Sequence, residues 1–112
     1  MIEISSIPPF DRELKRLNKK YKSLLQDICQ LRDELIKNPF LGTDLGKGVR
    51  KVRMAITAKG KGKSHGARII TYTDAVFSMD EGKLILFYIY DKAERDTISN
   101  KELEELLKYL KE

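Results

Sequence analysis

The cations of this sequence gather in one stretch. Between Leu45 and Thr73 the chain carries eight lysine and arginine residues and no aspartate or glutamate. The remaining residues comprise 14 basic and 17 acidic ones, so the positive charge is local. The eight cations are Lys47, Arg50, Lys51, Arg53, Lys59, Lys61, Lys63 and Arg68. Such a concentration attracts polyanions, of which nucleic acids are the usual ones, although a basic solubilising surface is the alternative.

Alternation along extended segments sorts these side chains between two faces. In VRKVRMAI, Lys51 and Arg53 share one face, opposite Val52 and the other apolar residues. In ARIITYT, Arg68 shares a face with Ile70 and Tyr72, and in LILFYIYD we expect Tyr88 and Tyr90 to lie opposite Ile85, Phe87 and Ile89. Cations bind phosphate and aromatic rings stack on unpaired bases, so this surface suits single-stranded RNA. A structural ion pair for Arg68, and core packing for Tyr72 and Tyr88, are the alternatives.

The segment KGKGKSHG, residues 59–66, is a predicted loop, because we expect so many glycines to prevent any regular element. Its backbone can approach phosphates closely, but it does not match the Walker A pattern. His65, the only histidine, is more typical of an exposed residue than of a catalyst. One cysteine and one histidine do not make a metal site of the usual ligand spacing. The residues expected to bind RNA are Arg50, Lys59, Lys61, Lys63, His65, Tyr72 and Tyr88.

The elements that must position these residues follow from apolar spacing and chain breakers. Residues 2–7 read as a strand, and Pro8-Pro9 suits a helix start. A second helical stripe from Tyr21 ends at Asn38-Pro39, and residues 42–48 read as a turn-rich connector. Residues 49–56, 67–73 and 84–91 are predicted strands, and a capping box at Ser99 and Glu102 begins a C-terminal helix. The order β-αα-βββ-α predicts an α+β fold whose helices cover one face of an antiparallel sheet.

The 112 residues fit a single domain, 1–112. The lone Cys29 cannot form an intrachain disulfide, which favours a reducing compartment such as the cytoplasm. The N-terminus lacks the features of a signal peptide, and no stretch approaches the length of a membrane span. We expect no cofactor, no metal, no membrane contact and no small-molecule ligand.

Three segments resemble the RelE/ParE toxin superfamily: NPFLGTDLGKGVRKVRMAI, KGKGKSHGARIITY and LILFYIYDKAE. They are most similar to a HigB-like branch with a KGKGKxxGxR loop, and the resemblance covers nearly the whole chain. It implies a RelE-like fold and a toxin of a type II toxin–antitoxin pair that enters the ribosomal A site and cuts mRNA. The implied partners are a cognate antitoxin, the ribosome and mRNA. The resemblance places active-site cations at Lys51, Arg53 and Arg68.

RNA cleavage by its own 2′-hydroxyl needs a base, a cation for the phosphorane and an acid for the 5′ oxygen. Lys51 could be the base, because neighbouring cations make a lysine ammonium easier to deprotonate, and Arg53 and Arg68 would hold the phosphate. Many RelE members carry an arginine after Gly-Lys near the last strand, where this chain has Asp91-Lys92-Ala93, and the C-terminal histidine of some HigB members is absent. Lys92 or Tyr90 would then supply the acid.

Two other functions remain open. A ParE-like inhibitor of DNA gyrase would not need a phosphate pocket, and a catalytically inactive member would only bind its antitoxin. The antitoxin that silences this basic protein is expected to be acidic and partly disordered. It would contact the basic face in part, or displace the C-terminal helix.

Overall fold

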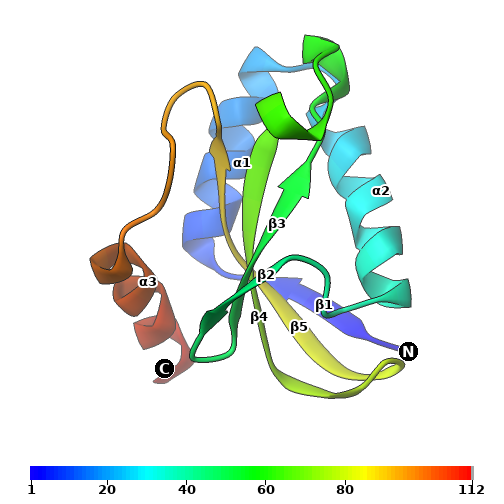
Figure 1. Ribbon diagram of the computed structural model, residues 1–112, viewed down its shortest axis with the longest axis vertical. Helices are drawn as coiled ribbons and strands as arrows, with labels where there is room; N and C mark the ends of the chain where they lie inside the picture. Colours follow the sequence, from blue (N-terminus) through cyan, green and yellow to red (C-terminus); the bar gives the residue numbers. More distant parts are fainter. Residues whose placement is uncertain (112) are drawn as a thin grey trace.

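The computed structural model describes residues 1–111 and has the predicted α+β architecture (Figure 1). Strand β1 (Glu3–Ser6) is followed by helices α1 (Pro8–Lys20) and α2 (Leu24–Lys37). Strands β2 (Thr43–Gly46), β3 (Val49–Met54), β4 (Ala67–Ser78) and β5 (Glu81–Asp91) come next. Helix α3 (Asn100–Leu107) and a short 3-10 segment (Lys108–Lys111) end the described chain.

The five strands form one mixed sheet in the order β1-β5-β4-β3-β2. Strands β2 to β5 pair antiparallel with their sequence neighbours, which was predicted for β3, β4 and β5. Strand β1 instead pairs parallel with β5, so the sheet is not purely antiparallel. The helical hairpin between β1 and β2 carries the chain across the sheet, which leaves β1 free to join the far edge in the parallel direction.

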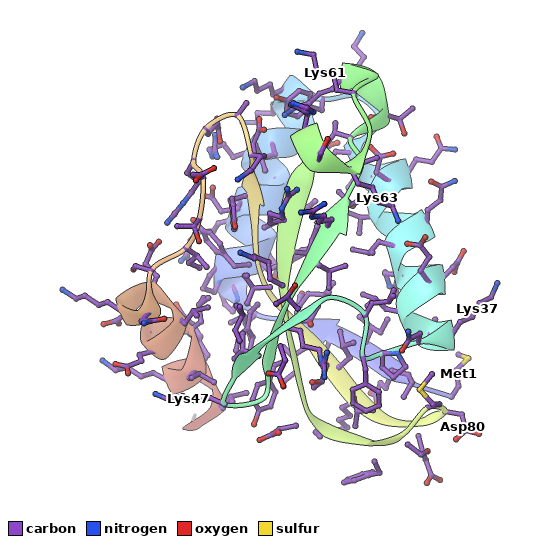
Figure 2. All side chains as sticks on the ribbon, viewed as in Figure 1. Met1, Lys37, Lys47, Lys61, Lys63 and Asp80 are labelled. Atoms are coloured by element: carbon purple, nitrogen blue, oxygen red, sulfur yellow. The ribbon has the colours of Figure 1, made fainter. Side chains whose placement is uncertain are left out.

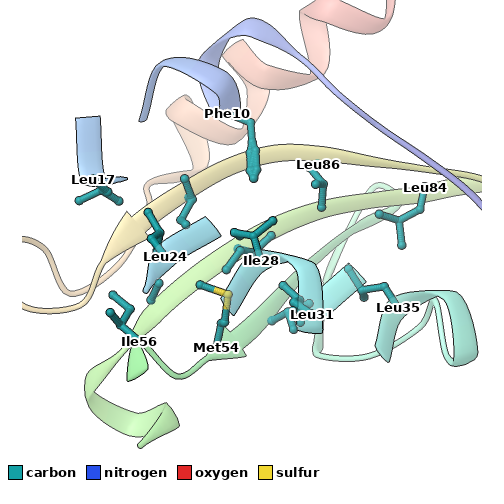
Figure 3. Packing of buried hydrophobic residues seen from close by; sticks show 14 of the residues in the cluster. Phe10, Leu17, Leu24, Ile28, Leu31, Leu35, Met54, Ile56, Leu84 and Leu86 are labelled. Atoms are coloured by element: carbon teal, nitrogen blue, oxygen red, sulfur yellow. The ribbon is translucent and has the colours of Figure 1, made fainter. Parts of the chain in front are cut away.

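Helices α1 and α2 cover one face of the sheet. Pro8 and Pro9 occupy the first positions of α1, and α2 ends at Asn38 before Pro39, as predicted. Leu17 and Leu24, from the two helices, are fully buried and pack in the same cluster as Met54 of the sheet (Figure 3). This cluster fixes β3 with Lys51 and Arg53 pointing the other way.

Helix α3 covers part of the opposite face, so the helices do not all lie on one side as expected. The predicted capping box is present: Ser99 Oγ accepts from the Glu102 backbone N–H, and Glu102 accepts from the Ser99 N–H. Leu106 is buried in a second cluster with Val49 and Phe87. The sheet has apolar side chains on both faces, and α3 leaves uncovered the part of its second face that carries the cations.

Three local features differ from the sequence prediction. Strand β2 lies in the segment read as a turn-rich connector, and the β4–β5 hairpin extends to Ser78 and Glu81, well beyond Thr73. Residues 57–59 and 63–65 form short 3-10 helices inside the segment read as an irregular loop. A register shift in the β4–β5 pairing places Phe87 and Ile85 in the same cluster as Tyr90 and Tyr88, so the expected opposition is wrong for Ile85 and Phe87. Ile89 lies in the other cluster, as expected.

Candidate functional site

Two cross-strand rows bring the predicted site residues together on one face of the sheet. Arg53 of β3 is opposite Arg68 of β4, which is opposite Tyr90 of β5. The next row on the same face consists of Lys51, Ile70 and Tyr88. We call the surface formed by Lys51, Arg53, Arg68 and Tyr88 the cation face. Alternation in β3 and β4 was therefore read correctly from the sequence.

Arg68 is the buried member of the cation face, with 6% of its surface exposed. Its guanidinium donates to the carbonyl oxygens of Lys63 (3.0 Å), Ala67 (3.1 Å) and Ser64 (3.3 Å). Burial lowers the pKa of Arg68 from its ordinary value, and the nearby Arg53 lowers it further. Arg68 does not form the structural ion pair considered as an alternative; it bonds to backbone carbonyls, which fix the end of the Lys/Gly loop against the sheet.

Arg53 and Lys51 are the accessible members of the cation face. Arg53 is exposed and Lys51 is half-buried. Both line a groove between β3 and the C-terminal half of α2, together with Lys63 and Glu34. Among the residues that the structure describes, no ion pair uses the side chain of Lys51, Arg53 or Lys63. Three cations without a fixed counter-ion in the described part of the chain therefore line one groove.

Tyr90 is the most buried aromatic residue near the cations. Its side chain is 1% exposed, and within residues 1–111 its hydroxyl has no hydrogen-bond partner. Burial raises the pKa of this phenol, against the opposing effect of Arg68 and Arg95. The Arg95 guanidinium lies 5.5 Å from the centroid of the Tyr90 ring. A buried phenol without a hydrogen-bond partner is costly, so the packing of the ring must offset that cost.

Residues 9–112 match the family model described as the RelE toxin of the RelE/RelB toxin–antitoxin system. The match spans nearly the whole chain, including every element that carries the cation face. The chain belongs to the RelE toxin family. It is a toxin of a type II toxin–antitoxin system, and the family implies a RelB-type antitoxin as its partner. The superfamily resemblance of the three segments is thereby confirmed.

Two of the cations expected to bind RNA are used inside this RelE-family toxin. The Lys59 ammonium, 12% exposed, pairs with a fully buried Asp91 carboxylate at 2.5 Å and also donates to the His65 carbonyl at 2.8 Å. The Arg50 guanidinium lies on the other side of β3, where it donates to the Phe40 carbonyl oxygen at 3.0 Å. Neither side chain joins the cation face, and both hold neighbouring segments in place.

Asp91 is the centre of this internal network. Besides Lys59, its carboxylate accepts from the Tyr21 hydroxyl at 2.5 Å and from the Ala93 backbone N–H at 2.9 Å. Burial alone would raise its pKa, but the bonds from Lys59, Tyr21 and Ala93 outweigh burial, and the pKa lies below its ordinary value. Asp91 therefore ties α1, the Lys/Gly loop and the end of β5 together.

The Lys/Gly loop is also fixed at its base. Asp27 of α2, 4% exposed, accepts from the Thr57 backbone N–H at 3.0 Å and from its hydroxyl at 2.6 Å. With Lys59 and Arg68 as the other anchors, only the middle of the loop projects. Figure 2 shows Lys61 at the tip of the toxin and Lys63 on the side that faces α2. The loop is thus a shaped support for two exposed lysines and His65, whose Nδ1 lies 2.9 Å from Ser64 Oγ.

Tyr72, Tyr88 and Lys92 have three different environments: the core, the border of the cation face and an ion pair. Tyr72 stacks on Phe87 with ring centroids 5.3 Å apart and packs in the cluster under α3, which is the core-packing alternative. Tyr88 is half-buried at the border of the cation face, and burial raises the pKa of its hydroxyl. The Lys92 ammonium pairs with the Asp96 carboxylate and donates to the Asp96 carbonyl at 3.0 Å.

Arg95 is a site residue that sequence reasoning missed. Its guanidinium makes two bonds to the Glu102 carboxylate, at 2.6 and 2.9 Å, while it covers the ring of Tyr90. It therefore connects the edge of the cation face to the capping box of α3. Its position beyond the last strand, in an irregular segment, gave no periodic signal that could have identified it.

Within residues 1–111, no group of three His, Cys, Asp or Glu side chains is arranged to hold a metal ion. Nor does any helix of that described part have the length and apolar character required to cross a membrane.

Proposed function

We propose that this RelE-family toxin is a ribosome-dependent endoribonuclease that cuts mRNA on the cation face and so inhibits translation. The observation that carries the proposal is the set of unpaired cations, Lys51 and Arg53, beside the buried Arg68. An inhibitor that binds only a protein surface has no use for such a phosphate site. The KGKGKSHGAR segment further supports a place in the HigB-like branch.

The proposed reaction is attack of a ribose 2′-hydroxyl on the adjacent phosphorus. The bond from the 2′ oxygen to phosphorus forms, and the bond from phosphorus to the 5′ oxygen breaks. Lys51 takes the proton of the 2′-hydroxyl as the general base, while Arg53 holds the phosphorane oxygens. The buried Arg68 adds positive charge beneath the phosphate. Its bond to the Lys63 carbonyl oxygen keeps Lys63 at the edge of the groove. The products are a cyclic phosphate and a 5′-hydroxyl, once that oxygen has received a proton.

We assign that proton to Lys92. Its ammonium is partly exposed, with 29% of the side chain accessible, and it pairs with Asp96, whose carboxylate also lies near the charges of Lys51 and Arg68. The hydroxyl of Tyr90 is buried and has Asp96 and Thr97 as neighbours, so substrate would reach it only after the 92–97 segment moved. Lys92→Gln should therefore lower the cleavage rate by about 100-fold, within the range of general acid catalysis.

Tyr90→Phe separates the two candidate acids. This change removes only the hydroxyl and keeps the ring beneath Arg95. If Lys92 is the acid, Tyr90→Phe should retain more than about a tenth of the wild-type rate. A loss of about 100-fold in Tyr90→Phe, with Lys92→Gln near wild type, would transfer the role to Tyr90.

The class of activity is tested by two parallel assays on the purified toxin. Translating ribosomes that carry a defined mRNA should yield cleaved transcripts, which primer extension detects. Supercoiling by DNA gyrase should be unaffected by the same toxin concentration. Inhibition of gyrase without mRNA cleavage would instead favour the ParE-like function.

A further inference from the structure

Helix α1 carries two rows of cations with different surroundings. Arg16 and Lys20 face the 91–95 segment, where Arg16 pairs with Glu94 at 2.7 Å and Lys20 lies 3.6 Å from Asp91. A second row is exposed and, among the residues that the structure describes, forms no ion pair or side-chain hydrogen bond. This α1 basic row consists of Arg12, Lys15, Lys19 and, just after the helix, Lys22.

The α1 basic row is a straight line of charges that points outward. At 100° per residue, Arg12, Lys15 and Lys19 lie within about 60° of one another, and roughly 150° from the helix positions that face the core. Those core positions include the buried Phe10 and Leu17. At 1.5 Å per residue the three helical cations span about 10 Å. Asp11, one turn before Lys15, is engaged by the Ser6 hydroxyl at 2.7 Å.

The α1 basic row and the cation face look in different directions. Helix α1 packs on the face of the sheet that carries Met54 and Leu86, whereas Lys51 and Arg53 project from the opposite face. In Figure 1, α1 lies behind the strands that present the cation face. One strand of RNA lying in the groove beside Arg53 would therefore not contact the α1 basic row, which is free for a second polyanion.

The composition of this surface favours nucleic acid over protein. Every exposed residue of α1 from Asp11 to Lys20 is charged, and none of them is apolar. Protein–protein interfaces need a desolvated apolar centre and are depleted in lysine. Lysine and arginine in a row instead suit phosphates along a nucleic-acid backbone, which they contact without reading its sequence.

We propose that the α1 basic row is a second RNA-binding surface that holds the phosphate backbone of ribosomal RNA while the cation face engages mRNA. This inference rests on the proposed function, since a ribosomal site lined by RNA is what would present RNA to two opposite sides of so small a protein. It assigns ribosome affinity to α1 and bond cleavage to the sheet.

The test measures binding of purified toxin to vacant ribosomes, without mRNA, over a range of salt concentrations. The triple variant Arg12→Gln, Lys15→Gln, Lys19→Gln removes three charges from the row. A matched control, Arg32→Gln, Lys83→Gln, Lys101→Gln, removes three exposed charges that are scattered over α2, β5 and α3. Both variants change the net charge equally, so a difference between them reports the position of the charges.

The row variant should bind on the order of 10- to 100-fold more weakly than the control at about 0.1 M salt, and its log–log salt slope should be smaller by about 2 to 3. Its thermal unfolding should match wild type, because the row makes no internal contact. If the triple variant failed to fold, two other variants would take its place. The double variant Lys15→Arg, Lys19→Arg keeps the charges and should bind normally. The single variant Lys19→Gln should bind more weakly. Equal affinities and slopes for row and control variants would overturn the inference, as would loss of antitoxin binding with ribosome binding intact.

The outcome is separable from that of the proposed function. A wild-type toxin that cuts no mRNA on ribosomes would refute the proposed function. A wild-type toxin that cuts mRNA, with a row variant that binds ribosomes like the control, would refute only the role of α1. The supporting outcome is cleavage by wild type and by the row variant at ribosome concentrations high enough to compensate for the weaker binding.

Discussion

The basic stretch contains two interleaved groups of cations, which are used in opposite ways. Arg50, Lys59 and Arg68 each bond to the protein itself, through carbonyl oxygens or the Asp91 carboxylate. Lys51 and Arg53, one and three residues after Arg50 in β3, have no such partner among residues 1–111. The lesson is that a run of like charges in a sequence contains both a scaffold and a binding surface, and only the contacts tell them apart.

Asp91→Ala should produce the largest effect on the scaffold side of this comparison. It leaves the Lys59 ammonium, 12% exposed, without its counter-ion and the Tyr21 hydroxyl without its acceptor. Breaking a buried pair from one side costs about 3–5 kcal/mol. Urea denaturation should show this loss, and Lys61→Ala, at the exposed tip of the same loop, is the control. A loss under about 1 kcal/mol would mean that the network is not a scaffold.

Arg68→Ala should lower both stability and cleavage. Three carbonyl oxygens, those of Lys63, Ser64 and Ala67, lose their charged donor, at a cost of about 2–3 kcal/mol. Alanine at Lys51 or Arg53 should instead leave the fold intact, because neither side chain forms an ion pair among residues 1–111. Thermal unfolding of Arg68→Ala beside Arg53→Ala measures the difference. Equal melting temperatures would contradict the scaffold role of Arg68.

Acid should loosen the contact between Arg95 and α3. Arg95 and the Ser99 N–H lower the pKa of Glu102 from 4.5 to about 2, although burial opposes this. Because the folded-state pKa is depressed, the stabilisation is present above the unfolded value of 4.5 and is lost as pH falls towards 2. The pair is partly exposed, so the effect is about 1 kcal/mol or less. Glu102→Gln should flatten the pH dependence of unfolding between these limits, and an unchanged profile would count against the pair.

The loop lysines should give the smallest and most specific difference. Lys61→Gln with Lys63→Gln removes two exposed charges, so the salt slope of ribosome binding should fall by about 1.5 to 2 with no change in stability. Lys59→Gln should instead destabilise the protein, because it leaves Asp91 buried without its ion pair. If Lys59→Gln changed only the salt slope and the Lys61, Lys63 variant lost stability, the loop would not be anchored at Lys59.

Local sequence signals predicted the parts of the fold that depend on local physics. The Pro8-Pro9 helix start, the Asn38-Pro39 helix end and the Ser99 capping box are each contained within a few residues. Alternation also placed Lys51 and Arg53 on one face, because β3 is regular and its other face is buried. These features could be read because each has its cause next to it in the chain.

The missed features depend on contacts between distant residues. Lys59 and Asp91 are 32 positions apart, and nothing in a Lys/Gly run indicates that its first lysine is buried. The hairpin beyond Thr73 was missed because its tip is solvated on both sides, with Phe77 80% exposed, so no burial pattern marks it. The shift that reorients Phe87 is a one-residue irregularity in pairing, which alternation alone cannot reveal.

The most direct test of the account is mRNA cleavage on translating ribosomes by the double variant Lys51→Ala, Arg53→Ala. These side chains bind no other part of the described protein, so thermal unfolding should be within a degree or two of wild type. Cleavage should fall by about 100-fold or more, because base and phosphate-holding cation are lost together. Cleavage at the wild-type rate by a folded double variant would contradict the assignment of the cation face as the active site.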